Sequence, residues 1–460
     1  MIAPQNRLIY WTALVSLAAA LLAAVEPTAL GPLITTVAAF VLLAVCDALL
    51  ATRKLRGVGA AFPEVVRMTK DREGELDVEI VCGGRAPGAT LERLRLGIAL
   101  PPEIESPWAD MECALAPGTE RSRVSWPCTP RRRGRYVIEN VYIEADSPLG
   151  LWAVRRVAPA RTELRVYPNL LGERSQLAAL FLNRGTLGIH AQRQVGKGRE
   201  FEKLREYMPG DSYEDIHWKA TAKRCRPVTK VFQIERTQEV YVVIDASRLS
   251  AREVQAPGAD AALGTTTQLE RFITAAMVLG LVAERQGDLF GVLAFDDQVR
   301  SFVRARNGKA HYAACRDALY TLTPRRVNPD FAEVCAFVRL RMRRRALLIF
   351  LTNLDDPVLA ESFTRDLEVL GRHHLVLVNM ITAPEVAPLF SDPEVSTTDD
   401  LYRRPDGLYR CLGGHLQWQS LRELEQVLRR RGVRMTLVDN ELMCPQLVSQ
   451  YINVKQRQVL

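Results

Sequence analysis

The sequence predicts a multidomain chain with an N-terminal transmembrane α-hairpin, a small β-sandwich and a C-terminal α/β Rossmann-like domain. Three patterns predict it: two long uncharged runs, then short stretches of alternating polarity, then continuous apolar stretches separated by helical periodicity. The 460 residues also exceed the about 250–300 at which one hydrophobic core usually divides. We expect four parts, the hairpin, the sandwich, a joining segment and the α/β domain, at residues 1–56, 57–170, 171–236 and 237–460.

The hairpin is predicted from Leu8–Val25 and Pro27–Cys46, runs of 18 and 20 residues that only Glu26 divides. A spanning helix needs about 20 predominantly apolar residues, so each run is long enough to cross a bilayer. Positive charges flank the two runs at Arg7, Arg53, Lys54 and Arg56. Because positive residues stay on the cytoplasmic side, we expect a two-pass protein of the bacterial inner (cytoplasmic) membrane with both termini in the cytoplasm.

The alternative to an anchor is a cleaved signal peptide, because Ala23 and Ala24 resemble a cleavage site. A second apolar run follows at once, however, and the nine cysteines form neither CxxC pairs nor a disulfide framework. Free cysteines are typical of a reducing compartment. We therefore favour the anchor, and we expect Asp47, at the edge of the second run, to reach the membrane interface.

The composition is that of a globular protein, with 48% apolar and 25% charged residues. The net charge of +8 includes arginine runs at Arg131–Arg133, Arg343–Arg345 and Arg429–Arg431. Such runs suit a protein facing anionic lipid headgroups, and nucleic-acid binding is the alternative. No aromatic-interleaved basic stripe accompanies them, so nucleic acid is not the expected partner.

Alternating polarity predicts strands of the sandwich at Leu76–Val81, Leu94–Ile98, Tyr136–Glu144 and Leu164–Pro168. This pattern gives a sheet with one solvated face. No residue pattern in this part is typical of catalysis.

A dense segment follows between Gly196 and Lys223. Pro209 and Gly210 predict a turn, and Asp211 with Glu214 three residues later fits a capping box that begins a short helix. Lys219 and Lys223 then lie one turn apart, and 228–235 is expected to be a strand.

These residues resemble the family called domain of unknown function 58. The resemblance is carried by a glycine-flanked Glu-Phe, a Leu-Arg-x-Tyr-x-Pro-Gly-Asp stretch and an Ile-x-Trp-Lys stretch, that is by Gly196, Gly198, Glu200, Phe201, Leu204, Arg205, Tyr207, Pro209, Gly210, Asp211, Ile216, Trp218 and Lys219. Arg133–Tyr136 and Asp146–Leu151 fit the approach to it, so the resemblance covers nearly the whole chain. Glu214 departs from it, since an arginine is common there.

Two interpretations of this segment stay open. In the first it joins the domains, with Phe201, Tyr207 and Trp218 as core and Arg205 and Asp211 as a buried pair. In the second it is a partner-binding surface. His217 is expected to be a hydrogen-bonded interface residue, because no nucleophile stands near it in sequence.

The C-terminal part alternates expected strands with expected helices. Strands are predicted at 239–245, 289–295, 346–351 and 375–381, and helices at 269–286, 331–343 and 421–431. This alternation favours a parallel sheet covered on both faces, whose ligands bind at the carboxyl ends of the strands.

The first such end, Asp245-Ala-Ser247-Arg-Leu249, is similar to the opening of a von Willebrand type A domain, where Asp-x-Ser-x-Ser binds magnesium. Asp245 and Ser247 match, so they are the expected magnesium ligands, but Leu249 replaces the second serine. Asn353 stands where that pattern has an aspartate. For the threonine of the middle loop, Thr321 and Thr323 are candidates.

One assured carboxylate holds magnesium weakly, so the alternative is that Asp245 and Ser247 cap the adjoining helix without an ion. We expect no other cofactor. The stretch from Arg252 to Gln268 is predicted to be a mobile loop beside this site.

The family resemblance implies a membrane-anchored scaffold or adaptor that partners a MoxR-type AAA+ ATPase, and further membrane or envelope proteins, in assembling or maturing complexes. The expected partner-binding residues are Asp245, Ser247, Asn353 and Asp355. An enzyme, such as a hydrolase of unknown substrate, is the alternative. We do not expect it, because the chain has no Gly-x-Ser-x-Gly elbow, Walker loop or HExxH helix.

Overall fold

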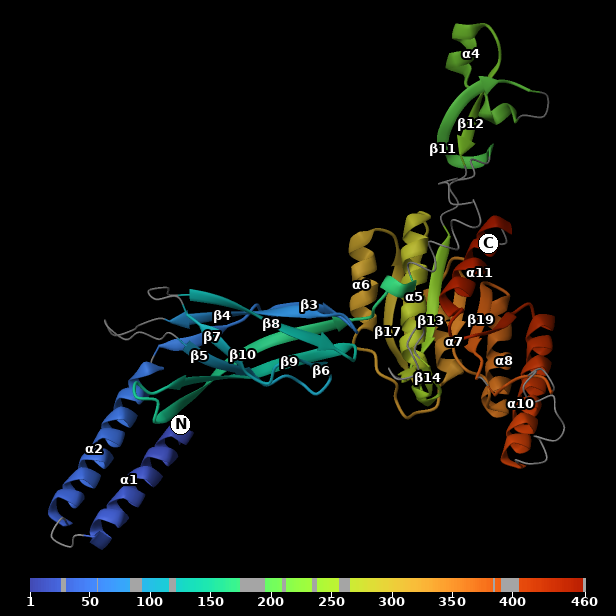
Figure 1. The fold of residues 1–460 in the computed structure, drawn as a ribbon. Helices are drawn as coiled ribbons and strands as arrows, with labels where there is room; N and C mark the ends of the chain where they lie inside the picture. Colours follow the sequence, from blue (N-terminus) through green and yellow to red (C-terminus); the bar gives the residue numbers. More distant parts are fainter. Residues whose placement is uncertain are drawn as a thin grey trace. The chain divides into compact units, whose positions relative to one another are not determined.

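The computed structural model describes residues 1–25, 30–55, 57–82, 93–115, 121–173, 195–208, 212–233, 238–255, 265–383, 385–389 and 405–457. The chain divides into two compact units, Met1–Asn169 and Leu170–Leu460. Figure 1 shows the elements of each unit in sequence colours.

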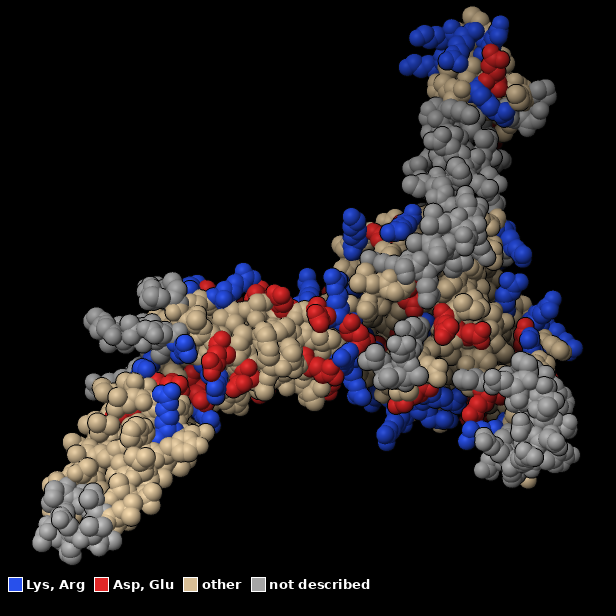
Figure 2. Space-filling view, in the orientation of Figure 1, with Lys and Arg blue, Asp and Glu red and all other residues tan. Residues whose placement is uncertain are grey.

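The first unit begins with a short strand, β1 (Ile2–Pro4), and two apolar helices, α1 (Asn6–Val25) and α2 (Leu30–Lys54). Within α2, Ile34–Thr52 is long and apolar enough to cross a membrane, with a mean hydropathy of 2.3, and only 17% of it is buried. The apolar stretch of α1, Asn6–Leu21, is shorter. Figure 2 shows that both helices present almost entirely uncharged side chains on the visible face. One helix near the N-terminus therefore fits a bilayer by length and composition.

The C-terminal half of α2 packs against the strands of the same unit. Asp47 is 2% exposed, and its Oδ1 accepts a hydrogen bond of 3.1 Å from the backbone N–H of Leu149. The indole Nε1 of Trp152 donates to the backbone oxygen of Ala44 at 2.9 Å. Asp47 therefore packs inside the protein instead of extending outward as expected, and the Leu149 donor offsets only part of the cost of burying it, since its Oδ2 has no partner among the described residues.

Two β-sheets complete this unit. The first has the order β1-β10-β9-β5-β7, with β3 pairing parallel to β10, and comprises β3 (Val65–Thr69), β5 (Arg93–Ile98), β7 (Met111–Ala114), β9 (Gly134–Asp146) and β10 (Trp152–Tyr167) besides β1. The second has the order β2-β4-β8-β6, from β2 (Val58–Ala61), β4 (Gly74–Cys82), β6 (Ile104–Glu105) and β8 (Arg121–Pro130).

The two sheets share one hydrophobic core. Leu76 and Trp126 of the second sheet and Leu96 and Ile143 of the first are fully buried in it. Along β4 every second residue is buried, as the alternating sequence predicts for a strand with one covered face.

The second unit opens with a β-hairpin and a short helix. Strand β11 (Val195–Glu206) pairs antiparallel with β12 (Val228–Gln233), and the connection carries a 3₁₀ turn, η2 (Tyr213–Asp215), and α4 (Trp218–Arg224).

The rest of the unit is built on a six-stranded sheet in the order β17-β16-β13-β18-β19-β20. Its strands are β13 (Glu239–Asp245), β16 (Leu289–Phe295), β17 (Val299–Arg306), β18 (Leu347–Leu351), β19 (Leu375–Ile381) and β20 (Arg434–Val438). Numbered by position in the chain, the order is 3-2-1-4-5-6, the Rossmann arrangement, which brings the carboxyl ends of the central strands to one edge. The α/β domain is as the sequence predicts, except that β17 runs antiparallel to β16.

Helices cover both faces of this sheet (Figure 1). One core contains residues of α5 (Gln268–Arg285), α6 (Lys309–Leu319) and α11 (Met443–Arg457). The other contains residues of α7 (Phe331–Arg341), α8 (Pro357–Gly371) and α10 (Pro405–Arg430). Buried strands covered on both sides explain why their sequences are continuously apolar.

Three details differ from the sequence predictions. Helix α7 ends at Arg341 rather than residue 343, because Met342 adopts an extended conformation, and α10 begins at Pro405, well before residue 421. The predicted mobile loop from Arg252 to Gln268 has ordered ends, since β14 (Glu253–Gln255) pairs with β15 (Thr265–Thr267). Its middle lies outside the described residues.

Candidate functional site at the carboxyl ends of the central strands

Asp245 is the last residue of β13, which lies between β16 and β18, and its side chain is fully buried. Its Oδ1 accepts a 2.8 Å hydrogen bond from the backbone N–H of Ser247. Its Oδ2 accepts a 2.6 Å hydrogen bond from the hydroxyl of Thr352, which follows β18. Each carboxylate oxygen therefore has a protein donor.

The electrostatics of this carboxyl group follow from its surroundings. Burial raises the pKa of Asp245, because the charged form loses its hydration. The hydrogen bonds from Thr352 and Ser247 act in the opposite direction, and the negative charge of Asp296 adds to the rise in the pKa. The two donors thus favour the charged form of the Asp245 carboxyl group, whereas burial favours its neutral form.

Ser247 is buried and caps the 3₁₀ turn η3 (Arg248–Ala251), because its Oγ accepts from the backbone N–H of Leu249 at 3.3 Å. Leu249, in place of the second serine, is 1% exposed and packs into the protein. This is the geometry of the capping alternative. The hydroxyl of the following Ser250 donates to the backbone oxygen of Ser247 at 2.9 Å.

Asn353 lies directly beside this group and is 1% exposed. Its amide nitrogen donates to Oε1 of Gln268, the first residue of α5. Its Oδ1 is buried without a hydrogen-bond partner in the described part of the chain. A buried oxygen without a donor is unfavourable.

The outer rim is made of ion pairs. Asp355 is paired with the Nη1 of Arg252 across the strand ends. Asp356, the cap of α8, lies 3.5 Å from the Nη2 of Arg248. We call the group formed by Asp245, Ser247, Thr352, Asn353 and Asp355 the carboxyl-end rim. The structure thus brings together all four of the predicted partner-binding residues.

Sequence reasoning missed Thr352, the donor to Asp245. It also missed Asp296, which follows β16 directly and is fully buried. Asp296 accepts from Arg300 Nε at 2.6 Å and from Arg325 Nη1 at 3.4 Å. Its position after an apolar strand, like that of Asp245, was the signal that could have found it.

The middle loop contributes backbone rather than a threonine side chain. Thr321 and Thr323 are exposed, and the Asp245 carboxylate takes its hydroxyl donor from Thr352 instead. The loop contacts the site through the N–H of Arg325, which donates to the backbone oxygen of Ala246 at 2.8 Å.

The donor set does not fit magnesium. Magnesium prefers an octahedron of oxygen ligands that includes carboxylates. Both oxygens of Asp245 already accept protein hydrogen bonds, and Asp355 is paired with Arg252. Among the described residues, no cluster of three His, Cys, Asp or Glu side chains is placed to hold a metal ion.

The segment between Gly196 and Lys223 lies in β11 and in the connection between β11 and β12. Leu204 and Arg205 pair with Lys230 and Thr229 in the ladder, and Ile216 is 7% exposed. Pro209, Gly210 and Asp211 lie outside the described residues, as do the side chains at 196, 198, 200 and 201. The predicted Arg205–Asp211 pair and the core position of Phe201 therefore also lie outside them.

Two expectations about this segment are wrong. Trp218 is 70% exposed rather than part of a core, and Tyr207 instead stacks on Tyr213 with ring centroids 5.9 Å apart. The helix begins at Trp218 rather than at Asp211, because the Nδ1 of His217 accepts from the backbone N–H of Ala220 at 3.0 Å and caps it. Lys219 and Lys223 both lie exposed on this helix, and Glu214 is exposed in the turn before it.

The Thr352–Asp245 hydrogen bond has a testable pH dependence. A carboxyl whose folded-state pKa is raised favours folding at low pH, and this contribution is lost as pH rises through the folded-state pKa. Thr352→Val removes a donor to the charged form and raises the pKa further. We expect it to lower the free energy of unfolding by about 1–3 kcal/mol at neutral pH, and by less as the pH falls and the carboxyl takes up its proton. Thermal melts of the detergent-solubilised chain at a series of pH values measure this, with Thr352→Ser as the control that keeps the hydroxyl. A loss that does not shrink as the pH falls through the range in which the carboxyl titrates would show that the hydroxyl does not serve the carboxylate.

Solved structures that match this chain include BatB from Bacteroides thetaiotaomicron, at 16% identity over 48% of this chain and 99% of that one, with a TM-score of 0.30. They also include an aerotolerance-related membrane protein from Bacteroides fragilis NCTC 9343, at 13% identity over 47% and 98% with a TM-score of 0.27. A third is the SpRpn10 VWA domain, at 12% identity over 47% and 94% with a TM-score of 0.26. No curated protein matches the chain.

Residues 203–400 match the family model described as "Protein of unknown function DUF58". The family that the segment between Gly196 and Lys223 resembles is thus the family whose model matches, and the match covers residues 203–400 rather than nearly the whole chain.

Proposed function

We propose that this protein is a membrane-anchored cytoplasmic scaffold or adaptor that docks protein partners on the carboxyl-end rim. The observation that carries the proposal is the two ion pairs at the outer face of the rim, Arg252–Asp355 and Arg248–Asp356, in which both arginine side chains are 45% exposed. A charged surface of a partner can reach these groups and pair with them. The rim needs no chemistry of its own, and we propose no catalytic activity.

The rim is suited to docking because it is fixed before a partner arrives. The Thr352–Asp245 hydrogen bond joins β13 to β18, and the Asn353–Gln268 contact joins β18 to α5. Groups that are already ordered lose little conformational entropy on binding. No magnesium ion is needed to organise them.

The partner proposed from the family resemblance is a MoxR-type AAA+ ATPase, with other membrane or envelope proteins as its clients. We propose that α1 and α2 form a two-pass transmembrane hairpin and that the two-sheet unit is a small β-sandwich. Anchoring both rim and clients to one membrane raises their effective concentration, so the rim need not bind tightly.

A capture experiment tests the docking site. The full chain in nanodiscs is mixed with the purified MoxR-type ATPase of the same organism, and the dissociation constant is measured. Asp355→Lys and Arg252→Glu each reverse one charge of the Arg252–Asp355 pair at the outer face of the rim. We expect each to weaken binding by about tenfold or more, the value of a lost charge-assisted hydrogen bond.

The matched control is Glu423→Lys, which reverses an exposed charge on α10 and should leave binding within about twofold, since it makes no rim contact. Equal binding by the rim variants and the control would remove the rim from the proposal. No capture of the ATPase by the unaltered chain would remove the partner.

The proposed topology has its own test. Cys225 is exposed, and the two-pass hairpin places it in the cytoplasm. A membrane-impermeant maleimide should therefore label Cys225 only after the cells are permeabilised. A cysteine introduced as Thr28→Cys, between the end of α1 and the start of α2, is the control, and it should react in intact cells. Labelling of Cys225 from outside would overturn the topology.

A further inference from the structure

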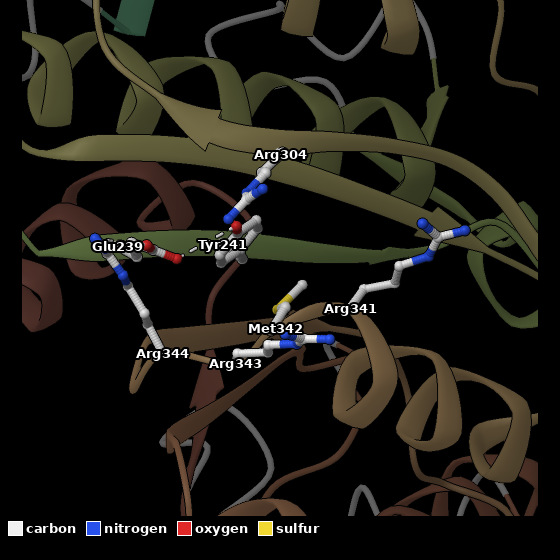
Figure 3. Close-up of a pocket in the computed structure, with 7 residues that line it drawn as sticks. All are labelled: Glu239, Tyr241, Arg304, Arg341, Met342, Arg343 and Arg344. Carbon is white, nitrogen blue, oxygen red and sulfur yellow. Dashed lines mark hydrogen bonds and ion pairs between the residues drawn. The ribbon is translucent and has the colours of Figure 1, made fainter.

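A second polar site lies at the opposite end of the α/β sheet from the rim. A pocket of about 300 Å³ is lined by Glu239 and Tyr241 of β13, Arg304 of β17, and residues 341–344 at the end of α7. Figure 3 shows these side chains coming from three separate elements. Because β13 begins at Glu239 and ends at Asp245, the pocket and the rim occupy opposite edges of one sheet.

The pocket is strongly basic. Four of the seven lining residues are arginines and one is acidic, so their formal charges sum to +3. The carboxylate of Glu239 lies 3.9 Å from Arg344, which it partly neutralises. Arg304, Arg341 and Arg343 make no ion pair with any carboxylate in the described ranges, and Arg341 instead lies over the ring of Phe337 at 5.8 Å. Three guanidinium groups therefore remain available to a ligand.

The floor of the pocket is buried and fixed. Tyr241 is 1% and Met342 5% exposed. The hydroxyl of Tyr241 accepts from the backbone N–H of Ala305 at 3.1 Å and donates to Glu239 at 3.5 Å, so this ring cannot turn away. Its ring also stacks on Phe302, with centroids 6.0 Å apart. The arginines thus surround a rigid base rather than a flat surface.

A purely structural role does not account for the arrangement. A positive charge near the last turn of a helix is favourable, which explains Arg341 at the end of α7. It does not explain Arg304, which comes from strand β17 and is far from that helix in sequence, or Arg343, which follows the helix. Several arginines that line one pocket from separate elements are typical of sites for oxyanions, because guanidinium groups bind oxyanions through paired N–H donors.

We propose that this pocket binds a phosphate dianion, either free or carried by a lipid headgroup. Phosphate offers several acceptor oxygens to several guanidinium forks at once, and its negative charge offsets the excess positive charge of the pocket. A volume of about 300 Å³ is at the lower limit of small-ligand pockets, which suits a small anion or a headgroup rather than a large molecule. The inference does not depend on the docking function proposed for the rim.

The test is calorimetric titration of the full chain in a neutral detergent with inorganic phosphate, at constant ionic strength set by chloride. We expect saturable binding that Arg304→Gln and Arg343→Gln each weaken by about tenfold to a hundredfold, the effect of a lost charge-assisted hydrogen bond. Arg339→Gln is the matched control, because Arg339 is exposed on the same helix α7 but does not line the pocket. It should leave the affinity within about twofold.

A second arm titrates short-chain phosphatidic acid. Binding at least about tenfold tighter than that of inorganic phosphate assigns the site to a lipid headgroup, and equal binding assigns it to a free anion. Thermal melts confirm that each variant is folded. The proposal is overturned if phosphate binding does not saturate, or if folded Arg304→Gln, Arg343→Gln and Arg339→Gln bind phosphate alike.

Discussion

The carboxyl-end rim depends on the hydrogen bonds that Thr352 and Ser247 donate to the Asp245 carboxylate. A buried carboxylate without donors is highly unfavourable. Here the sheet supplies the donors, because parallel β13 and β18 end at the same edge and place Thr352 within 2.6 Å of Oδ2. The turn after β13 supplies the Ser247 N–H. The sheet topology thereby organises the rim.

The same topology separates two kinds of polar chemistry. The central strands β13 and β18 are buried and apolar between their ends, so polar groups gather where these strands begin and end. At the carboxyl ends, acidic groups are held by hydroxyl, amide and arginine donors. At the amino ends, arginines exceed carboxylates around the buried Tyr241. One sheet thus presents a neutralised rim and a basic pocket.

Local sequence patterns predict the parts of this structure that local physics decides. Continuous apolar runs indicate β13, β16 and β18, and the position of Asp245 at a strand end indicates the site. The antiparallel β17 and the partner of Asp245 were not predictable in this way, because Thr352 is 107 residues away and its role depends on strand order. The arginine pocket was not predictable from the sequence for the same reason, because Arg304 and Arg343 line one pocket only once the chain is folded. Trp218 shows the reverse error, because a large apolar residue suggested a core position that the short helix α4 does not provide.

The account depends most on the claim that protein donors, not a cation, stabilise the Asp245 carboxylate. The most direct measurement is the melting temperature of the full chain with magnesium chloride and with EDTA at matched ionic strength. If Thr352 and Ser247 supply the donors, magnesium does not change the melting temperature of the unaltered chain, and it does not change that of Asp245→Asn. A saturable rise in melting temperature with magnesium that Asp245→Asn abolishes would contradict the account, because only a cation bound at this carboxylate would produce it.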